Sequence, residues 1–410
     1  MKILHVVEGM DPKLGGVCQA IRTIVRGLSD EGIANEVVTL DPPDANFLSF
    51  DHFPVHALGP KKTAWSYSRN YSPWLKKNLQ KFDFVIIHGL WLYNSYATFK
   101  VWIELKNKCK SEESERSLPK LYVMPHGMLD PYFQEAAGRK LKAVRNSIYW
   151  KLIESKIING ADGLLFTCEE ERRLSHKPFH PYQPKTEIIL GMGTEAPPEY
   201  ELALTRAFLQ ACEDLDGRPY FLFLSRIHEK KGVENLISAY EILLEKNSGN
   251  SIPALMIAGP GKETSYGRKL EERVKKSPLL MSSVFFPGML TDKTKWGAFY
   301  GCEAFILPSE QENFGIAVVE ALACAKAVLI SDQINIWREI YEASAGLVAP
   351  KSVTGTLSLL QNWMSLSGEQ KREMEENSLK CYRKFYAVDS FVQRWKQNLL
   401  MPTYTSTMGI

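Results

Sequence analysis

The sequence predicts an α/β protein made of two doubly wound domains, each with a parallel sheet. Its 410 residues are too many for one ordinary hydrophobic core. Short apolar runs alternate with segments of helical period, as in strand–helix–strand units. The pattern weakens after Gly191, where Pro197, Pro198 and the acidic turn at residues 213–217 indicate a connecting region between two such series.

The first series contains six apolar runs that we expect to be strands. They span residues 2–9, 35–40, 82–89, 120–127, 161–167 and 186–191. A helix between the first two runs is predicted by apolar residues at helical spacing, namely Val17, Ala20, Ile21, Ile24, Val25 and Leu28. A second helix is expected over residues 139–158, whose apolar stripe beneath the basic groups consists of Leu141, Val144, Ile148 and Leu152.

The second series supplies five more expected strands, at residues 220–225, 253–259, 283–288, 304–309 and 327–332. A helix is expected over residues 233–246, and residues 366–400 are expected to be helical with no further strand. We place the two domains at residues 1–200 and 201–387. In such folds ligands bind beyond the carboxyl ends of the strands, so we expect the functional residues in the loops that follow strands, facing an interdomain cleft.

Composition excludes several classes of protein. The net charge is only +3, from 50 basic and 47 acidic residues, which argues against a general polyanion binder. The seven cysteines form no Cys-x-x-Cys pair, as expected for a reduced, cytoplasmic protein. The N-terminus lacks the features of a signal peptide, and no apolar stretch approaches the length of a membrane span. Any membrane contact is therefore expected to be peripheral, at the inner face of the membrane.

Two stretches concentrate basic residues. Residues 61–81 carry six basic groups, no acid and four aromatic rings, and residues 138–158 carry six basic groups with Glu154 as the one acid. Three readings are open. The stretches are solvated faces, or they bind an anionic membrane through the lysines and the rings, or, least favoured, they bind nucleic acid. The rings in the first stretch are Trp65, Tyr67, Tyr71 and Trp74.

The loop after the first expected strand contains Gly15 and Gly16. Glycines there allow a close backbone approach, and the helix start beyond them offers free amides to an anion. The alternative is an ordinary strand–helix turn. The loop has no G-x-G-x-x-G pattern, which argues against a standard dinucleotide dehydrogenase.

A basic loop follows the expected strand at residues 220–225. Arg226 and Lys231 lie five residues apart in it and could converge on a diphosphate from two sides. Gly232 then opens the helix 233–246, whose dipole adds to the same field. A solvated basic turn is the alternative, because Lys230 lies there too.

Two glutamates flank an apolar run after the strand at 304–309. Glu312 is expected in the loop and Glu320 in the second turn of a helix that begins near Phe314, with Asn313 as its N-cap. The helix amides would face an anion, and Glu312 would accept hydrogen bonds from hydroxyls beside it. The alternative, a surface helix with a capping acid, gives no reason for an acid amid the alanines of 317–323.

Four segments carry a resemblance to a known family. The segment PSEQENFGIAVVEALA looks like the signature of glycosyltransferase family 4, and SRIHEKKG resembles the phosphate-binding segment of that family. The Gly15–Gly16 loop resembles its N-terminal glycine loop, and MPHGMLDP at 124–131 its histidine loop. The resemblance implies a GT-B fold, with two Rossmann-like domains around a cleft, and retaining transfer of a sugar from a nucleotide sugar. It also implies that a C-terminal helix, here 388–410, returns to the first, acceptor-side domain.

The resemblance assigns roles to matching positions. Glu320 would bind the ribose hydroxyls, Glu312 those of the transferred sugar, and Arg226 and Lys231 the diphosphate, while His126 would lie by the reacting sugar. The catalytic set is therefore His126, Glu312, Arg226 and Lys231. The donor-binding set is Gly15, Gly16, Arg226, Lys231, Gly288, Met289, Glu312, Asn313, Phe314, Gly315, Ile316 and Glu320. The acceptor-side candidates are His88, Trp91 and Asp130, of which His88 could equally be a core histidine.

One position departs from the family pattern, because Gly193 stands where relatives often have Asp. No metal or other cofactor is expected, since the cations and a helix terminus can stabilise the departing diphosphate. Asp214 and Asp216 match an Asp-x-Asp metal motif, but they precede a strand instead of following one.

The predicted function is transfer of a hexose to a glycan or lipid-linked glycan in polysaccharide biosynthesis. Glucose from a UDP-sugar is the first expectation, and GDP-mannose is the second donor. The alternatives are a sugar-nucleotide epimerase or phosphorylase of the same fold and a non-catalytic subunit that binds the nucleotide sugar.

Overall fold

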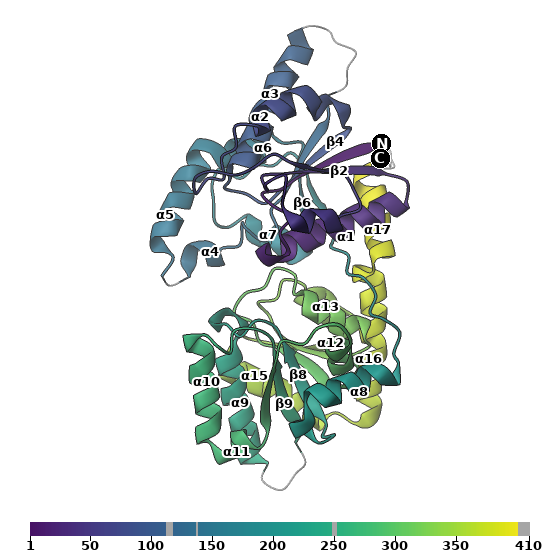
Figure 1. Cartoon of the computed structure of the whole chain (residues 1–410). Coiled ribbons are helices and arrows are strands. Elements are labelled where there is room, and N and C mark those ends of the chain that lie inside the picture. Colours follow the sequence, from purple (N-terminus) through teal and green to yellow (C-terminus); the bar gives the residue numbers. More distant parts are fainter. Residues whose placement is uncertain (112–117, 137, 248–251, 401–410) are drawn as a thin grey trace, which may run out of the picture. The chain divides into compact units, whose positions relative to one another are not determined.

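The computed structural model describes residues 1–111, 118–136, 138–247 and 252–400. The chain forms two compact units (Figure 1). Unit 1 consists of Met1–Gly193 together with Val388–Ile410, and unit 2 of Thr194–Ala387. The boundary therefore lies between residues 193 and 194, not between 200 and 201. No helix among the described residues is long and apolar enough to cross a membrane.

Unit 1 contains a seven-stranded parallel sheet in the order β3-β2-β1-β4-β5-β6-β7. The chain leaves β1 for one half of the sheet and returns to β4 on the other side of β1, which creates a topological switch point between β1 and β4. The strands are β1 Lys2–Val6, β2 Ala34–Thr39, β3 Val55–Ala57, β4 Phe84–His88, β5 Lys120–Met124, β6 Gly163–Phe166 and β7 Glu187–Ile189.

Apolar helices cover both faces of this sheet. One face is completed by the C-terminal segment, because Phe391, Trp395 and Leu399 are buried among sheet residues such as Ile3 and Ile86. Figure 1 shows α17 of this segment beside α1. The α-helices of unit 1 are α1 Gly16–Asp30, α2 Tyr71–Asn78, α3 Tyr93–Ser111, α4 Tyr132–Glu135, α5 Lys140–Tyr149, α6 Ser155–Gly160, α7 Glu169–Ser175 and α17 Val388–Trp395. Two π-helical turns, Trp150–Glu154 and Lys396–Leu400, follow α5 and α17.

Unit 2 repeats this topology with six parallel strands in the order β10-β9-β8-β11-β12-β13. Its switch point lies between β8 and β11. The strands are β8 Tyr220–Leu224, β9 Ala254–Ala258, β10 Val284–Gly288, β11 Ala304–Leu307, β12 Val328–Ser331 and β13 Gly346–Ala349. The α-helices are α8 Leu202–Ala211, α9 Val233–Lys246, α10 Ser265–Lys276, α11 Pro278–Met281, α12 Asp292–Gly301, α13 Ile316–Ala323, α14 Trp337–Glu342, α15 Val353–Ser365 and α16 Gly368–Cys381.

Some elements have no counterpart among the predicted ranges, including strands β3 and β13 and helix α3. Strands β3 and β13 are three and four residues long. Helix α3 has no clean apolar stripe because its polar residues Asn94, Ser95 and Thr98 are buried. All eleven expected strands are present, several of them shorter than the predicted runs, and residues 366–400 are helical as expected.

The predicted helix 139–158 differs in two ways. It is divided into α5, a π-helical turn and α6. It is also oriented with the opposite side inward, since Trp150, Ile157 and Ile158 are buried. The predicted stripe is exposed to 88% at Leu141, 59% at Val144, 55% at Ile148 and 63% at Leu152. The segment therefore has two apolar sides, and periodicity alone does not say which one enters the core.

Candidate active site

The predicted donor-binding residues of unit 2 gather at its switch point. The loop after β8 carries Arg226 and Lys231, and the loop after β11 carries Glu312. The two loops touch, because the Glu310 amide donates to the Lys230 carbonyl at 2.8 Å. Gly232 is required where they meet: its φ is 69°, and a Cβ atom would lie 2.0 Å from the Pro308 carbonyl oxygen.

Lys231 and Glu312 form an ion pair with each other. Their side chains are 14% and 23% exposed, so the pair is partly screened from water and still reachable. Arg226 is exposed in the same loop. The arrangement presents a cation and a carboxylate side by side, as a ligand with both phosphates and hydroxyls requires.

The backbone of Glu312 is held on both sides by the loop after β12. Its amide donates to the Gln333 carbonyl at 3.0 Å, and its carbonyl accepts from the Asn335 amide at 3.0 Å. The Asn335 side chain also donates to Asn313 Oδ1 at 3.2 Å. The loop at the end of β12 therefore fixes the position of Glu312, and the hydrogen bond to Asn313 strengthens this attachment.

Helix α13 begins later than predicted, at Ile316. Its N-cap is Gly315, with φ of 76°, so the expectation that Asn313 caps the helix was wrong. Helices α1 and α9 likewise begin after a glycine, Gly15 and Gly232, and none of the three has a side-chain cap. Helices elsewhere in unit 2, such as α10 and α15, are capped by Thr264 and Ser352. Uncapped starts leave amide groups that suit an anion.

Glu320 lies in the second turn of α13, with 12% of its side chain exposed. Its carboxylate accepts from Lys295 Nζ of α12 at 2.6 Å. Burial raises the pKa of Glu320, and the lysine acts in the opposite direction. Lys295 was not predicted, since nothing in the sequence links it to a residue 25 positions away. Gly288 ends β10 with φ of 83°, and the following Met289 is 68% exposed.

Unit 1 places His126 just beyond β5, half-buried, with φ of 53°. His126 Nε2 lies 2.9 Å from His88 Nδ1, and His88 Nε2 lies 3.0 Å from His5 Nδ1. Burial lowers the pKa of His126 to about 4. The next residue is held by Glu171, whose Oε1 accepts from the Gly127 amide at 2.5 Å. The histidine is therefore fixed from the sheet and from α7.

The acceptor-side candidates differ in their surroundings. His88 is buried and hydrogen-bonded through both ring nitrogens, which favours the reading as a core histidine over direct acceptor contact. Trp91 is half-buried with φ of 75°, and its amide donates to Glu154 Oε2 at 3.1 Å. Asp130 is buried, and its Oδ1 accepts from the Tyr132 amide at 2.8 Å, so it shapes the turn before α4.

Gly193, the departure from the family pattern, packs against the C-terminal helix. A Cβ atom at this position would lie 3.1 Å from Phe391 Cδ1. A larger residue would therefore press on the phenylalanine that closes the core of unit 1.

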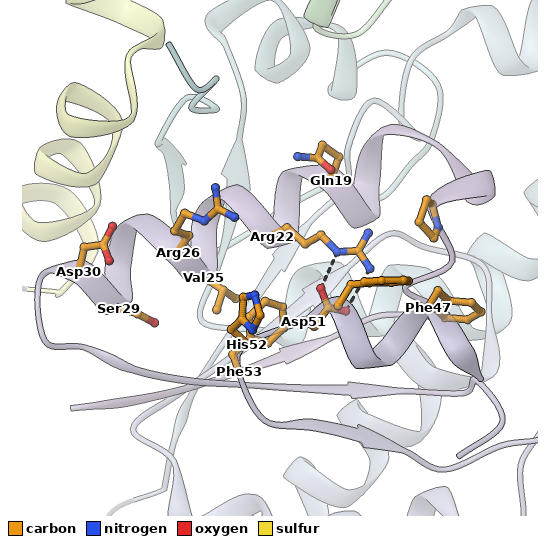
Figure 2. A pocket seen from close by; sticks show the side chains of 12 residues that line it. Gln19, Arg22, Val25, Arg26, Ser29, Asp30, Phe47, Asp51, His52 and Phe53 are labelled. Atoms are coloured by element: carbon orange, nitrogen blue, oxygen red, sulfur yellow. Dashed lines mark hydrogen bonds and ion pairs between the residues drawn. The ribbon is translucent and has the colours of Figure 1, made fainter. Parts of the chain in front are cut away.

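A cavity of about 500 Å³ lies on the flank of α1 (Figure 2). Figure 2 shows Arg22 pointing to Asp51 in its wall, and the two residues are joined by bonds of 2.6 Å and 3.0 Å. Phe47 and Phe53 line it as well, and it includes none of the predicted site residues. In the described part of the chain, no cluster of three or more His, Cys, Asp or Glu side chains is arranged to hold a metal ion.

Comparison with known families assigns both units. Residues 15–189 match the model for the "Glycosyl transferase 4-like domain", and residues 209–380 match that for "Glycosyl transferases group 1". The chain belongs to glycosyltransferase family 4. It is a hexosyltransferase with the GT-B fold. The predicted motif positions of unit 2, from Arg226 to Glu320, fall inside the second matched segment.

Two relatives and two solved structures illustrate the relationship. The chain is 22% identical to the O-antigen chain mannosyltransferase C of Escherichia coli over 406 residues, covering 96% of this chain and 97% of the relative. It is 27% identical to the alpha-D-kanosaminyltransferase of Streptomyces kanamyceticus over 179 residues, 42% of this chain and 43% of the relative. The fold is similar to that of Anabaena HepE, solved with UDP and glucose (TM-score 0.67, 15% identity, covering 96% and 98% of the chains). It is equally similar to that of the sucrose-phosphate synthase of Thermosynechococcus elongatus (TM-score 0.67, 18% identity, 97% of each).

Proposed function

We propose that the enzyme transfers a hexose, with retention of configuration, from a nucleoside-diphosphate sugar to a glycan acceptor in polysaccharide biosynthesis. The observation that carries the proposal is the pair of Lys231 and Glu312 at the switch point of unit 2, beside the uncapped start of α13. A cation and free amides suit a diphosphate, and a carboxylate suits sugar hydroxyls.

In this proposal each group has one task. Lys231 and Arg226 stabilise the negative charge that grows on the departing diphosphate, and the amides of α13 add to that field. Glu312 accepts hydrogen bonds from the transferred sugar, and Glu320 accepts them from the ribose. When the donor binds, its hydroxyls replace part of the hydrogen bonding that Lys231 gives to Glu312 and Lys295 gives to Glu320. Gly288 and Met289 are assigned to the base, and His126 to the reacting sugar.

The relatives point to two donors. The relative that aligns over 406 residues is named a mannosyltransferase, which supports GDP-mannose. The similar Anabaena structure contains UDP and glucose, the pair that the sequence analysis placed first. The proposal therefore includes UDP-glucose and GDP-mannose, and the nucleotide experiment below decides between them.

The surface of unit 1 supports a lipid-linked acceptor presented on an anionic membrane. The exposed stripe on α5 and the following turn is flanked by lysines that pair with no acid in the described part of the chain: Lys140, Lys142 and Lys151. The one acid of this segment, Glu154, is buried. A stripe of large apolar side chains bordered by cations is the pattern of a helix that lies at a lipid interface.

The other basic stretch adjoins this surface. Trp65 Nε1 donates to Tyr149 Oη at 2.9 Å, so residues 61–81 lie against the end of α5. Of its four rings, Tyr67 is 41% exposed, whereas Tyr71 is fully buried and hydrogen-bonded to Thr98 at 2.9 Å. Trp65 and Trp74 are half-buried against the core. We therefore assign the apolar membrane contact mainly to α5, with this stretch contributing charge and the exposed ring of Tyr67.

The nucleotide experiment measures thermal stabilisation by UDP, GDP and ADP. A ligand that binds only the folded state, at 100 times its Kd, adds about 2.7 kcal/mol. We expect one nucleotide to stabilise the wild type, and Glu320→Gln to lose most of that shift. Glu303→Gln is the control, since Glu303 pairs with Lys371 away from the switch point. No shift with any nucleotide would overturn the proposal.

Release of free nucleotide separates transfer from epimerisation. With the donor that the stabilisation experiment selects, a transferase releases nucleoside diphosphate in proportion to sugar transferred to a glycan acceptor. Interconversion of the sugar nucleotide without release supports the epimerase instead. If neither free nucleotide nor an interconverted sugar nucleotide forms, the result supports the non-catalytic subunit.

Membrane contact is tested with vesicles of phosphatidylcholine, with and without phosphatidylglycerol. We expect co-sedimentation with the anionic vesicles alone. The double variant Leu141→Ser, Ile148→Ser should lose it, whereas Leu202→Ser, at an exposed leucine of unit 2, should retain it. Equal sedimentation of all three proteins would mean that α5 is simply a solvated face.

A further inference from the structure

Four neighbouring strands of unit 1 carry a continuous chain of hydrogen-bonded side chains. Asn35 lies on β2, His5 on β1 and His88 at the end of β4, and His126 follows β5. The links measure 3.1 Å from Asn35 Oδ1 to His5 Nε2, 3.0 Å from His5 Nδ1 to His88 Nε2, and 2.9 Å from His88 Nδ1 to His126 Nε2. The chain thus crosses the sheet from a buried amide to a predicted catalytic residue.

The surroundings of the chain are apolar. His5 and His88 share the face of the sheet that bears Ile3 and Ile86, and the rings of His5 and Trp395 are 6.5 Å apart between centroids. Burial lowers the pKa of His5 and His126 to about 4, and that of His88 well below its usual value. All three imidazoles are therefore neutral near pH 7, and each has one N–H group.

Asn35 sets the direction of the chain. Its Nδ2 lies 2.7 Å from the Ile33 carbonyl oxygen, which can only accept a hydrogen bond. That atom is therefore the amide NH2 group, and the atom that faces His5 is the amide oxygen, which also only accepts. His5 must then donate from Nε2.

The direction passes from ring to ring. With its proton on Nε2, neutral His5 has a bare Nδ1, so His88 must donate from its own Nε2. His88 Nδ1 is then bare as well, and His126 must donate from Nε2. One amide thus leaves His126 with an unprotonated Nδ1, an atom that bonds to no group in the described part of the chain.

We propose that Asn35, His5 and His88 are positioning residues that hold His126 in the Nε2–H tautomer, so that its bare Nδ1 accepts a hydrogen bond from a hydroxyl of the transferred sugar. The sugar in this statement rests on the proposed function, whereas the tautomer does not. An acceptor at this place selects a ligand that presents a hydroxyl, and it gives no hydrogen bond to an oxygen that lacks a proton.

The far end of the chain shows why these residues position His126 and do not relay protons. A proton taken up at His126 Nδ1 could release the Nε2 proton to His88, and then onward to His5. The last step would deliver it to the Asn35 amide, which is not a base at physiological pH. The chain therefore ends in a group that takes up no proton, and its effect is to lock one tautomer.

The first test is the ¹⁵N spectrum of the wild-type protein with labelled histidine, without ligand, near pH 7. Protonated and bare ring nitrogens resonate in separate ranges, so the tautomer of each histidine is read directly. We expect N–H at Nε2 and a bare Nδ1 for His5, His88 and His126. A proton on Nδ1 of His126 in the folded protein overturns the inference, and this test requires no variant.

The second test breaks the chain with His88→Phe, which keeps a ring in the same place. We expect His126 to populate both tautomers, and kcat/KM for the donor that stabilises the protein to fall about tenfold. Preference for the intact donor over its monodeoxy analogues should fall with it. The control is Thr98→Val, which also removes one buried hydrogen bond from unit 1, to Tyr71, and should leave the His126 tautomer and the analogue preference unchanged.

The outcomes separate this inference from the proposed function. If His126 shows the expected tautomer but no nucleotide sugar binds, the proposed function fails, and the inference that the hydrogen-bond chain holds the His126 tautomer remains. If the donor is turned over while His88→Phe leaves both the His126 tautomer and the analogue preference as in the wild type, the inference that the hydrogen-bond chain holds this tautomer is wrong, and the proposed function remains.

Discussion

His126 in unit 1 and Glu312 in unit 2 occupy similar places, each just beyond the end of a strand. His126 follows β5, the neighbour of the switch-point strand β4, and Glu312 follows β11, at the switch point of its sheet. They are held in opposite ways. His126 is fixed by uncharged hydrogen bonds that run back through three strands to an amide. Glu312 is fixed by its backbone, and its side chain forms an ion pair with Lys231.

This difference matches the groups that Glu312 and His126 are proposed to bind. A ligand with phosphates can compete for Lys231 because an ion pair between partly exposed groups is worth little and is easily exchanged. A buried chain of neutral rings offers no such exchange, and so it suits a group that must keep one orientation. The predictions below test whether the two sides respond as differently as they are built.

The largest effect is expected from Lys231→Met, which keeps the length of the side chain and removes its charge. We expect kcat to fall about 10²–10³-fold, because a charge that stabilises the departing diphosphate is lost. Steady-state kinetics with the selected donor measures this. Lys230→Met, in the same turn, should stay close to the wild type. If both variants lose activity equally, the loop is a general basic turn without a dedicated lysine.

The next effect concerns Glu154, the buried acid that holds the Trp91 amide. Burial raises its pKa from 4.5 to about 8. The folded state therefore holds a proton that the unfolded state releases above pH 4.5, and stability is lost as the pH rises towards 8. Between pH 6 and pH 9, Glu154→Gln should gain about 3 kcal/mol in the free energy of unfolding relative to wild type.

Urea unfolding of unit 1 at the two pH values, followed by hydrogen exchange of β4 and β5, measures this difference. Glu104→Gln removes an exposed acid of the same unit and should show no pH-dependent gain. An unchanged difference between Glu154→Gln and wild type would mean that this carboxyl is already ionised at pH 6, and that unit 1 buries a charge.

The smallest effect is that of salt. The four side chains of the pairs Lys231–Glu312 and Lys295–Glu320 are 14%, 23%, 24% and 12% exposed. Raising NaCl to about 0.5 M should raise the Kd of the nucleoside diphosphate only about two- to fivefold, because salt screens the charges. The ¹⁵N pattern of His126 should not change at all. A salt-dependent tautomer would contradict the contrast between the two sides.

The sequence predicted the local parts of this molecule well. Strands and the loops after them are visible as apolar runs with Gly, Lys and Glu at their ends, so Lys231 and Glu312 could be assigned before their contact was known. The histidine chain could not be predicted, because His5 and His88 are 83 residues apart and meet only through the strand order. Lys295 was missed for the same reason.

The orientation of α5 shows a second limit of sequence patterns. Leu141 and Ile148 on one side and Trp150 and Ile157 on the other are equally apolar, and only tertiary packing decides which side is buried. The late start of α13 is a smaller difference, set by Gly315 at the start of the helix.

The return of the chain to unit 1 affects the order in which the protein is made. Phe391, Trp395 and Leu399 are among the last described residues to leave the ribosome, and the core of unit 1 is incomplete until they arrive. Unit 2 is one continuous segment, Thr194–Ala387, and can acquire all its contacts earlier. During synthesis, one face of the sheet in the first 193 residues is therefore covered only in part, by Ile24 and Leu28 of α1, until the C-terminal segment has been translated after unit 2. A released chain that ends at Ala387 should be protected from protease in unit 2 and cleaved in unit 1.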